Sequence, residues 1–288
     1  MPVVHPAELN TETGNLEYPK IVILETCSYC NARCKFCAYS YMKRKKGIMP
    51  PRLFVQIIDE ISSWNREVEI VPTMFGEFFL NPDWVEYLAY IKYLLPGIAI
   101  SLPTNGSKVD DNALNFLVEV PNLKFVSFSV YAHTPEVYHE LIGLPVDTIA
   151  KVKHAVERLQ KERPDIVVRI GATLDHEFMN NGEEIERMAH EFDTMIDVHS
   201  IIKNHEYHGY EHSPSQIDSC GSVFDVMVVL HDGRVVPCCF DPEAEIVLGD
   251  ATKNTLLEIW NGDAARDLRT KHALGQRGEI PLCRSCSL

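Results

Sequence analysis

Short runs of β-branched residues alternate with longer helical patterns from Lys20 to about Lys203. The short runs predict strands at Ile21–Leu24, Glu69–Thr73, Ile98–Pro103, Phe125–Val130, Ile166–Thr173 and Met195–Ile202. Apolar residues at helical spacing predict helices at Leu53–Trp64, Trp84–Leu95, Asn112–Val118, Thr148–Leu159 and Glu183–Phe192. This alternation is typical of βα units and of a parallel sheet.

The number of strands limits the architecture. Six strands are two fewer than a closed eight-stranded barrel needs, so we expect an α/β fold with a partial, open (β/α)6 barrel. The functional loops of parallel α/β folds lie at the carboxyl ends of the strands. We therefore expect the chemistry at that end of the barrel.

The composition changes after Lys203. A His- and Tyr-rich stretch at 204–212 marks a boundary, and Phe224–Leu230 and Arg234–Val236 predict a β-hairpin around an Asp-Gly turn. Thr255–Arg269 predicts one amphipathic helix. The expected organisation is an N-terminal extension at 1–19, the partial barrel at 20–203 and a small C-terminal β-hairpin and helix domain at 204–288.

Charge and hydropathy exclude some classes of function. The 27 Lys and Arg residues against 41 Asp and Glu residues give a net charge of −14, which argues against nucleic-acid and membrane-surface binding. An acidic protein is compatible with a cationic substrate. The N-terminus lacks the pattern of a signal peptide, and no apolar run approaches the roughly 18 residues of a membrane span, so we expect a cytoplasmic protein.

All nine cysteines lie in two groups, at 27–37 and at 220–286. A disulfide framework is typical of short secreted chains with an even number of cysteines. An odd number in two groups indicates metal or redox chemistry instead.

The first group follows the first predicted strand. Cys30, Cys34 and Cys37 can hold a 4Fe–4S cluster by three thiolates, which leaves one iron open to another ligand. Cys27 adds a fourth thiolate, so a structural zinc or a four-ligand cluster is the alternative. The Cys-x3-Cys-x2-Cys spacing resembles the signature of the radical S-adenosylmethionine (SAM) superfamily. That resemblance implies that the open iron binds SAM, and that Cys27 packs as a small buried residue.

Other motifs at the strand ends resemble the same family. Gly76 and Glu77 are similar to the middle of its Gly-Gly-Glu-Pro motif, which implies a close backbone approach to the cofactor at Gly76 and a hydrogen bond from the SAM amine to Glu77. Phe75 and Phe78 replace the outer Gly and Pro. Asn105 lies in a Thr-Asn-Gly turn like that of the family.

The resemblance also implies roles for residues on three further segments. Phe36 stands where an aromatic residue contacts the SAM adenine, and Ser129 stands where a serine contacts the SAM carboxylate. Arg169 could neutralise that carboxylate. Packing of Phe36 and a structural ion pair of Arg169 are the alternatives.

The second group resembles the SPASM/twitch extension, which binds an auxiliary 4Fe–4S cluster. The implied ligands are Cys220, Cys238, Cys283 and Cys286, and a four-cysteine zinc site is the alternative. Cys239 is left over. On an extended strand its side chain would point away from that of Cys238, either toward the barrel as a hydrogen-atom donor or into packing.

The resemblance implies an enzyme with two 4Fe–4S clusters and SAM. It would form a 5′-deoxyadenosyl radical that abstracts hydrogen from a C–H group of its substrate. We expect a small polar substrate such as an amino sugar or aminocyclitol, because the segment before the first strand is short. Epimerisation with Cys239 as donor and dehydrogenation through the auxiliary cluster are both open. Modification of a ribosomally made peptide is an alternative, although about 20 residues before the first strand are too few for a leader-binding domain.

Two further segments have less specific patterns. The basic run at 43–46 could dock an acidic donor of the flavodoxin or ferredoxin type or contact an anionic substrate, or it could be a solvated loop. The stretch at 205–212 could bind a metal, or it could be a boundary loop that lines the substrate cavity. A binding module with two zinc knuckles is the non-enzymatic alternative.

Overall fold

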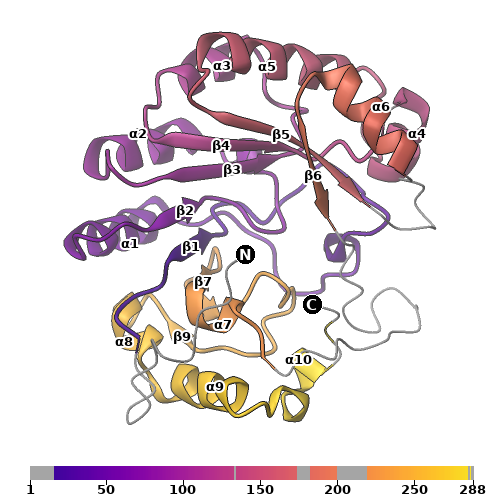
Figure 1. Ribbon diagram of the computed structural model, residues 1–288. Coiled ribbons are helices and arrows are strands. Elements are labelled where there is room, and N and C mark those ends of the chain that lie inside the picture. Colours follow the sequence, from indigo (N-terminus) through magenta and orange to yellow (C-terminus); the bar gives the residue numbers. More distant parts are fainter. Residues whose placement is uncertain (1–15, 133, 174–181, 200–218, 285, 287–288) are drawn as a thin grey trace.

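Among the residues that the structure describes, nine strands form one open sheet at the centre of the molecule (Figure 1). The computed structural model describes residues 16–132, 134–173, 182–199, 219–284 and 286. The sheet has the order β6-β5-β4-β3-β2-β1-β7-β8-β9. Its first six strands pair in parallel and are β1 (Ile21–Leu24), β2 (Glu69–Val71), β3 (Ile100–Thr104), β4 (Leu123–Phe128), β5 (Val167–Thr173) and β6 (Met195–His199).

Helices cover one face of these six strands (Figure 1). They are α1 (Pro51–Ser63), α2 (Trp84–Leu94), α3 (Asp111–Val118), α4 (Pro135–Ile142), α5 (Thr148–Glu162) and α6 (Gly182–Phe192). In α1, Leu53, Phe54, Ile57, Ile58 and Ile61 recur at helical spacing and are all buried. The predicted partial (β/α)6 barrel is confirmed, because the sheet curves under its helices without closing.

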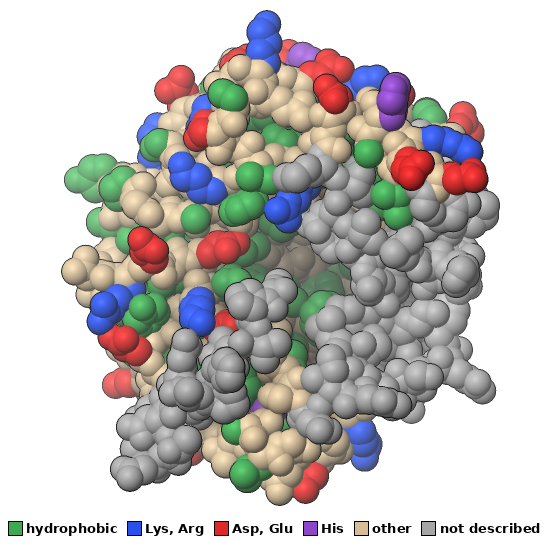
Figure 2. Space-filling model, in the orientation of Figure 1, with side chains coloured by type: hydrophobic (Ala, Val, Ile, Leu, Met, Phe, Trp, Pro, Cys, Tyr) green, Lys and Arg blue, Asp and Glu red, His purple; other side chains and the backbone are tan. Residues whose placement is uncertain are grey.

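Alternation along the strands separates the two faces of the sheet. In β3 and β4 the fully buried side chains, such as Leu102 and Val126, belong to the apolar core together with the helices. Pro103, Phe125 and Ser127 alternate with them and are only half buried. These half-buried residues line the concave face, and Figure 2 shows a hollow at the centre of this side of the molecule.

The C-terminal part continues the same sheet. The predicted hairpin is confirmed as β7 (Val226–Val229) and β8 (Arg234–Val236), with β9 (Gly249–Asp250) beside β8. Strand β7 pairs in parallel with β1 over Ile21–Leu24. The remaining helices are α7 (Ser222–Asp225), α8 (Leu256–Trp260), α9 (Asp263–Ala273) and α10 (Pro281–Arg284).

Two helix predictions differ from the structure. The single helix predicted at Thr255–Arg269 is wrong, because Gly262 has an extended backbone and separates α8 from α9. Helix α4 is absent from the predicted helices, although Thr134 caps its start and Gly143 ends it in a left-handed conformation. The expected boundary between residues 203 and 204 and the His-rich stretch lie outside the described residues. None of the described helices has the length and apolar character needed to cross a membrane.

Candidate functional site

The first cysteine group lies in a loop that begins directly after β1. Ser28 donates its backbone N–H to the Gly47 carbonyl (2.9 Å), and Cys27 forms an isolated bridge with Ile48, so both ends of the loop are held together. A short 3-10 helix, η2 (Ala38–Ser40), begins after Cys37. The loop therefore has a fixed base and presents its cysteines at the carboxyl end of β1.

Cys30, Cys34 and Cys37 come close together in this loop. Burial raises the pKa of the Cys30 thiol to about 11 and also raises the pKa of Cys34 and Cys37. The charges of Cys37 and Cys30 raise the pKa of Cys34 further. Three neighbouring buried thiolates are unfavourable unless a positive centre compensates them. The donor set therefore fits an iron–sulfur cluster, whose irons supply that charge.

Cys27 differs from these three cysteines. Its side chain is fully buried, and its thiol donates to the Tyr29 carbonyl at a sulfur–oxygen distance of 3.6 Å. The charges that affect its pKa, after burial, come from Glu25 and Glu77 rather than from the other cysteines. The expected burial of Cys27 is confirmed.

Glu77 lies in the loop after β2, at the base of the cysteine loop. Its carboxylate accepts hydrogen bonds from the Thr104 hydroxyl (2.7 Å), the Asn105 N–H (2.8 Å) and the Phe79 N–H (3.3 Å). Burial raises its pKa in spite of these donors. A carboxylate has about four acceptor positions. One position therefore remains for an amine, which is compatible with the role that the sequence predicts for Glu77.

Gly76 is required by a contact with the cysteine loop. A Cβ at this position would lie 1.9 Å from the carbonyl oxygen of Cys27. The next residue, Glu77, donates its N–H to the Tyr29 carbonyl at 2.8 Å. The close approach at Gly76 is thus made by the backbone that carries the cysteines.

Asn105 connects the loop after β3 to the cysteine loop. Its side-chain amide donates to the Asn31 side chain (2.9 Å) and lies 4.0 Å from the Cys30 sulfur. Its own oxygen accepts from the Ser107 N–H at 2.9 Å. Glu77, Asn105 and Cys30 therefore lie together at the carboxyl end of the parallel strands.

Phe36, Ser129 and Arg169 are the three remaining residues with predicted roles toward SAM. Phe36 packs edge-on against Tyr131, with ring centroids 4.7 Å apart. Ser129 follows β4 directly and donates its N–H to the Thr104 carbonyl at 2.8 Å. Arg169 lies on β5 opposite Ser127, and its guanidinium is 5.5 Å from the Phe125 ring centroid. Their roles toward SAM stay predictions.

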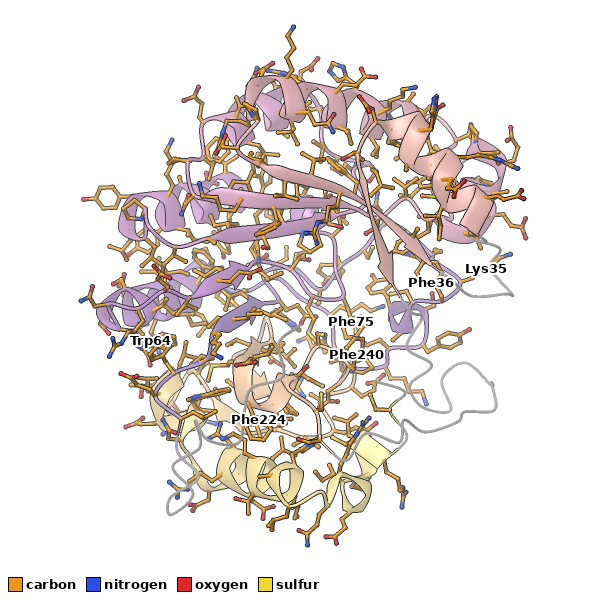
Figure 3. All side chains as sticks on the ribbon, viewed as in Figure 1. Lys35, Phe36, Trp64, Phe75, Phe224 and Phe240 are labelled. Atoms are coloured by element: carbon orange, nitrogen blue, oxygen red, sulfur yellow. The ribbon has the colours of Figure 1, made fainter. Side chains whose placement is uncertain are left out.

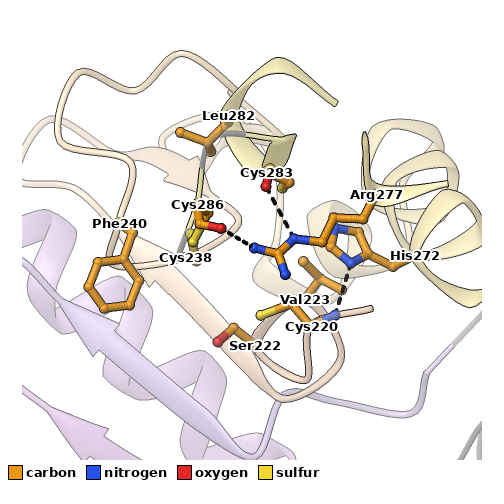
Figure 4. A pocket seen from close by; sticks show the side chains of 10 residues that line it. All are labelled: Cys220, Ser222, Val223, Cys238, Phe240, His272, Arg277, Leu282, Cys283 and Cys286. Carbon is orange, nitrogen blue, oxygen red and sulfur yellow. Dashed lines mark hydrogen bonds between the residues drawn. The ribbon is translucent and has the colours of Figure 1, made fainter. Parts of the chain in front are cut away.

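The second cysteine group surrounds one cavity. Cys220, Cys238, Cys283 and Cys286 line it together with residues of α7, α9 and the segment that leads to α10 (Figure 4). Burial, with the charges of Cys239 and Cys283, raises the pKa of Cys238 well above its usual value. As in the first group, gathered buried thiols fit a cationic cluster. The fold brings these four residues together from three separate segments of the chain.

The two cysteine groups lie toward opposite ends of the paired strands β1 and β7. The first follows the end of β1, whereas Cys220 precedes α7 and the beginning of the parallel strand β7. Cys238 follows the antiparallel strand β8, so it lies toward the same edge as Cys220. The two groups are therefore separated along the strands by about the length of β1, and a strand of about four residues spans about 13 Å.

The expected position of Cys239 on an extended strand is wrong. Strand β8 ends at Val236, and Cys239 lies in the turn that follows Cys238. Burial raises its pKa to about 11, and the charges of Cys220 and Cys286 contribute to this increase. Cys239 therefore lies next to the auxiliary cysteines. In a turn, neighbouring side chains need not point in opposite directions as they do on a strand.

Sequence reasoning missed a buried polar network that joins the two cysteine-bearing segments. Glu25, just after β1, forms a two-pronged ion pair with Arg44 and accepts a hydrogen bond from the His231 ring (3.1 Å). Arg44 and Lys43 donate their backbone N–H groups to Glu243. Burial opposes ionisation of Glu25, but His231 and Arg44 outweigh it and lower its pKa.

This network also corrects the interpretation of the basic run at 43–46. Arg44 is buried in the ion pair, and the Lys46 Nζ lies 3.8 Å from the Tyr39 ring centroid. Lys43 and Lys45 are the exposed members. The run is therefore not a simple solvated loop.

None of the nine cysteines, all of which are described, forms a disulfide. Among the described residues, no three His, Cys, Asp or Glu side chains are grouped closely enough to hold a single metal ion. A 4Fe–4S cluster does not need such a group, because each of its cysteine ligands binds a different iron.

Comparison with known proteins agrees with this geometry. The chain is 23% identical to the S-adenosyl-L-methionine-dependent 2-deoxy-scyllo-inosamine dehydrogenase of Niallia circulans, over 93% of this chain and 92% of that protein. It superimposes on BtrN in complex with AdoMet and 2-DOIA with a TM-score of 0.68, 20% identity and 93% coverage of both chains.

A second solved structure has the same fold. SuiB of Streptococcus suis, bound to the precursor peptide SuiA, superimposes with a TM-score of 0.73 and 16% identity, over 96% of this chain and 71% of that one. Residues 24–191, more than half of the chain, match the Radical SAM superfamily, and residues 220–287 match the SPASM iron-sulfur cluster-binding domain. The chain therefore belongs to the radical SAM superfamily, with a domain that binds a 4Fe–4S cluster and SAM and a SPASM domain for an additional cluster.

Proposed function

We propose that this enzyme is a radical SAM dehydrogenase that oxidises a C–H group of a small polar substrate of the amino sugar or aminocyclitol class. The observation that carries this choice over epimerisation is the position of Cys239. It lies in the turn after β8, beside Cys220 and Cys286, and its thiol is buried there. A hydrogen-atom donor must reach the substrate carbon, whereas Cys239 lies beside the cysteines that we assign to the auxiliary cluster.

We propose that Cys30, Cys34 and Cys37 hold the first cluster, and that Cys220, Cys238, Cys283 and Cys286 hold the second. When bound, these groups would supply the cleavage of SAM to methionine and a 5′-deoxyadenosyl radical and the removal of a hydrogen atom from the substrate carbinol. The second electron that the substrate loses would pass to the auxiliary cluster, and the hydroxyl proton would pass to a base. The net product is a ketone. One hydrogen atom, one electron and one proton leave the substrate for each SAM.

The chain's own residues orient the cofactor in this proposal. Glu77 offers its remaining acceptor position to the SAM amine, and its three protein donors hold the carboxylate still. Ser129 and Arg169 face the SAM carboxylate, and Phe36 contacts the adenine. Tyr131, packed edge-on against Phe36, fixes the orientation of that ring.

The substrate class is supported by the relative that acts on 2-deoxy-scyllo-inosamine and by the negative charge of the chain. The half-buried Ser101 and Ser127 on the concave face offer hydroxyl groups to a polar substrate. The external electron donor in this proposal is of the flavodoxin or ferredoxin type, and the exposed Lys43 and Lys45 would contact its acidic surface.

The test uses anaerobic enzyme with both clusters, SAM, a flavodoxin and 2-deoxy-scyllo-inosamine as the probe. We expect 5′-deoxyadenosine and a ketone in equal amounts, with no deuterium from deuterated water on the target carbon. Cys239→Ala should retain dehydrogenation, because the thiol takes no part in it. Cys30→Ala is the inactive control.

An epimer that carries solvent deuterium and disappears in Cys239→Ala would show that the thiol is a donor and would overturn the proposal. Turnover of a ribosomal peptide in place of the aminocyclitol would overturn the substrate class alone.

A further inference from the structure

One histidine lies at the auxiliary cavity. His272, near the end of α9, is 1% exposed and lines the cavity together with Cys220, Cys238, Cys283 and Cys286 (Figure 4). No part of the proposed reaction uses this residue. A buried polar side chain at this place needs a reason, because buried polar groups are nearly always hydrogen-bonded.

The hydrogen bonds of His272 define which ring nitrogen carries the hydrogen. Nδ1 lies 3.1 Å from the backbone nitrogen of Cys220, which is a donor, so Nδ1 is the acceptor. An imidazole that accepts at Nδ1 is neutral and carries its hydrogen on Nε2.

That Nε2–H donor is buried and has no hydrogen-bond partner among the described residues. Four cysteines line the same cavity, together with apolar residues such as Val223, Phe240 and Leu282. Iron–sulfur clusters accept hydrogen bonds at their sulfurs, and such bonds are one determinant of their reduction potentials. The unpaired donor and the sulfur-rich cavity thus complement each other.

We propose that His272 tunes the auxiliary cluster by donating a hydrogen bond from Nε2 to one of its sulfurs. This inference rests on the proposed auxiliary ligands. The bond is stronger in the reduced cluster, which carries one more negative charge, so it raises the reduction potential. His272 thereby makes the cluster a better acceptor for the second electron of the proposed dehydrogenation.

A neighbouring arginine acts in the same direction. Arg277 is 4% exposed and donates to the carbonyls of Cys283 (3.1 Å) and Cys286 (2.8 Å). Its positive charge beside two proposed ligands also favours the reduced state. Figure 4 shows Arg277 and His272 adjacent to each other at one side of the cavity.

The test separates the two nitrogens of His272. In the full chain with Cys30→Ala, Cys34→Ala and Cys37→Ala, only the auxiliary cluster contributes to the spectrum. His272→Asn places a carbonyl oxygen near the Nδ1 position and keeps the acceptor for Cys220, but it loses the donor at Nε2. His272→Gln places an amide N–H near the Nε2 position and keeps the donor.

A redox titration of the reduced cluster by electron paramagnetic resonance gives the midpoint potential. We expect His272→Asn to lower it by the equivalent of about a tenfold change in the reduction equilibrium, which is about 59 mV for one electron. His272→Gln should stay near the parent. His154→Asn, on the exposed surface of α5, is the control and should titrate like the parent.

The possible failures are distinguishable. An unchanged potential in His272→Asn, with about four irons bound, overturns the tuning role and leaves the ligand set intact. Loss of iron from His272→Gln, with parent-like iron and potential in His272→Asn, shows that His272 only anchors Cys220 through Nδ1 and also overturns the tuning role. A parent that binds no iron overturns the ligand set and this inference together.

Discussion

At the scale of single residues, the ion pair of Glu25 and Arg44 is the most deeply buried charge pair in the described structure. The Arg44 side chain is 4% exposed and the Glu25 side chain is 0% exposed. Arg44→Met leaves the Glu25 carboxylate buried with one charged partner removed, which costs about 3–5 kcal/mol. We expect a large fall in the melting temperature, and a smaller one when Glu25→Leu is added, because no buried charge is then stranded.

The control for this experiment is Lys153→Met. Lys153 pairs with Glu191, and their side chains are 40% and 51% exposed, so its loss should change the melting temperature far less than Arg44→Met does. A double variant that melts lower than Arg44→Met would contradict the argument from the stranded charge.

The same network predicts a pH dependence. The pKa of Glu25 lies below its usual value of 4.5, so its stabilising effect is complete above that pH and is lost as the pH falls through the folded-state pKa. Glu25→Gln should therefore melt lower than wild type at about pH 6, and the difference should shrink at about pH 3.5. Thermal melting followed by circular dichroism measures both. A difference that is constant with pH would mean that Glu25 is not ionised in the fold.

Gly76 gives a residue-scale prediction about the first cluster. Gly76→Ala places a Cβ 1.9 Å from the Cys27 carbonyl oxygen and must displace the cysteine loop. We expect the iron content to fall from about eight to about four per chain. Gly97→Ala is the matched control, because nothing lies within 4 Å of its Cβ position. Full iron content in Gly76→Ala would show that the loop can yield at no cost to the cluster.

Residue spacing predicts the first cysteine group because Cys30, Cys34 and Cys37 recur at short intervals, whereas the second group is predicted from its resemblance to a known extension. The network of Glu25, Arg44 and His231 has no such signal. Its members are up to 206 positions apart, and each is an ordinary polar residue in the sequence. The motif identifies Gly76, but it cannot show that a protein backbone, rather than the cofactor, occupies the space beside it.

At the scale of elements, the break between α8 and α9 shows where periodicity is insufficient. The apolar spacing continues through 255–269, yet Gly262 is extended and the Asn261 side chain accepts the Leu16 N–H (3.0 Å). A contact with a distant segment thus accompanies the end of α8. Likewise, the turn after Val236 leaves no sign in the β-branched run before it, so the predicted strand position of Cys239 is wrong.

The start of α8 carries a capping box. Thr255 accepts from the Glu258 N–H, and Glu258 accepts from the Thr255 N–H. Thr255→Ala should therefore lower the free energy of unfolding by about 1 kcal/mol, measured by denaturant titration. Thr270→Ala, in the interior of α9, is the control and should be neutral or slightly stabilising, because alanine has the higher helix propensity. Equal effects of the two changes would contradict the role of the cap.

At the scale of the whole molecule, the auxiliary region is part of the barrel's sheet. Strands β7, β8 and β9 extend the sheet beyond β1. Figure 3 labels Phe75, in the loop after β2, near the centre of the view and Phe224, in α7, below it. Hydrophobic patterns along the strands predict the six-stranded part. The pairing of β7 with β1 could not be predicted, because strand partners distant in sequence leave no local pattern.

Removal of the auxiliary region should therefore harm the barrel itself. A chain that ends at residue 219 leaves β1 as an unpaired edge, which is prone to aggregation. We expect little soluble protein, measured by yield and circular dichroism. The full chain with alanine at Cys220, Cys238, Cys283 and Cys286 keeps β7 and should stay soluble. A soluble truncated chain with about four irons would show that the barrel is independent.

The position of β7 beside β1 also affects how the chain is made. Strand β1 leaves the ribosome early, but its neighbour begins only at Val226. For roughly 200 intervening residues at about 5–20 residues per second, the first strand waits on the order of 10–40 s for that neighbour. During this interval its backbone edge and the nascent cysteine loop are exposed. Completion of the sheet, and with it the buried contact of Glu25 with His231, is therefore a late event in the synthesis of each molecule.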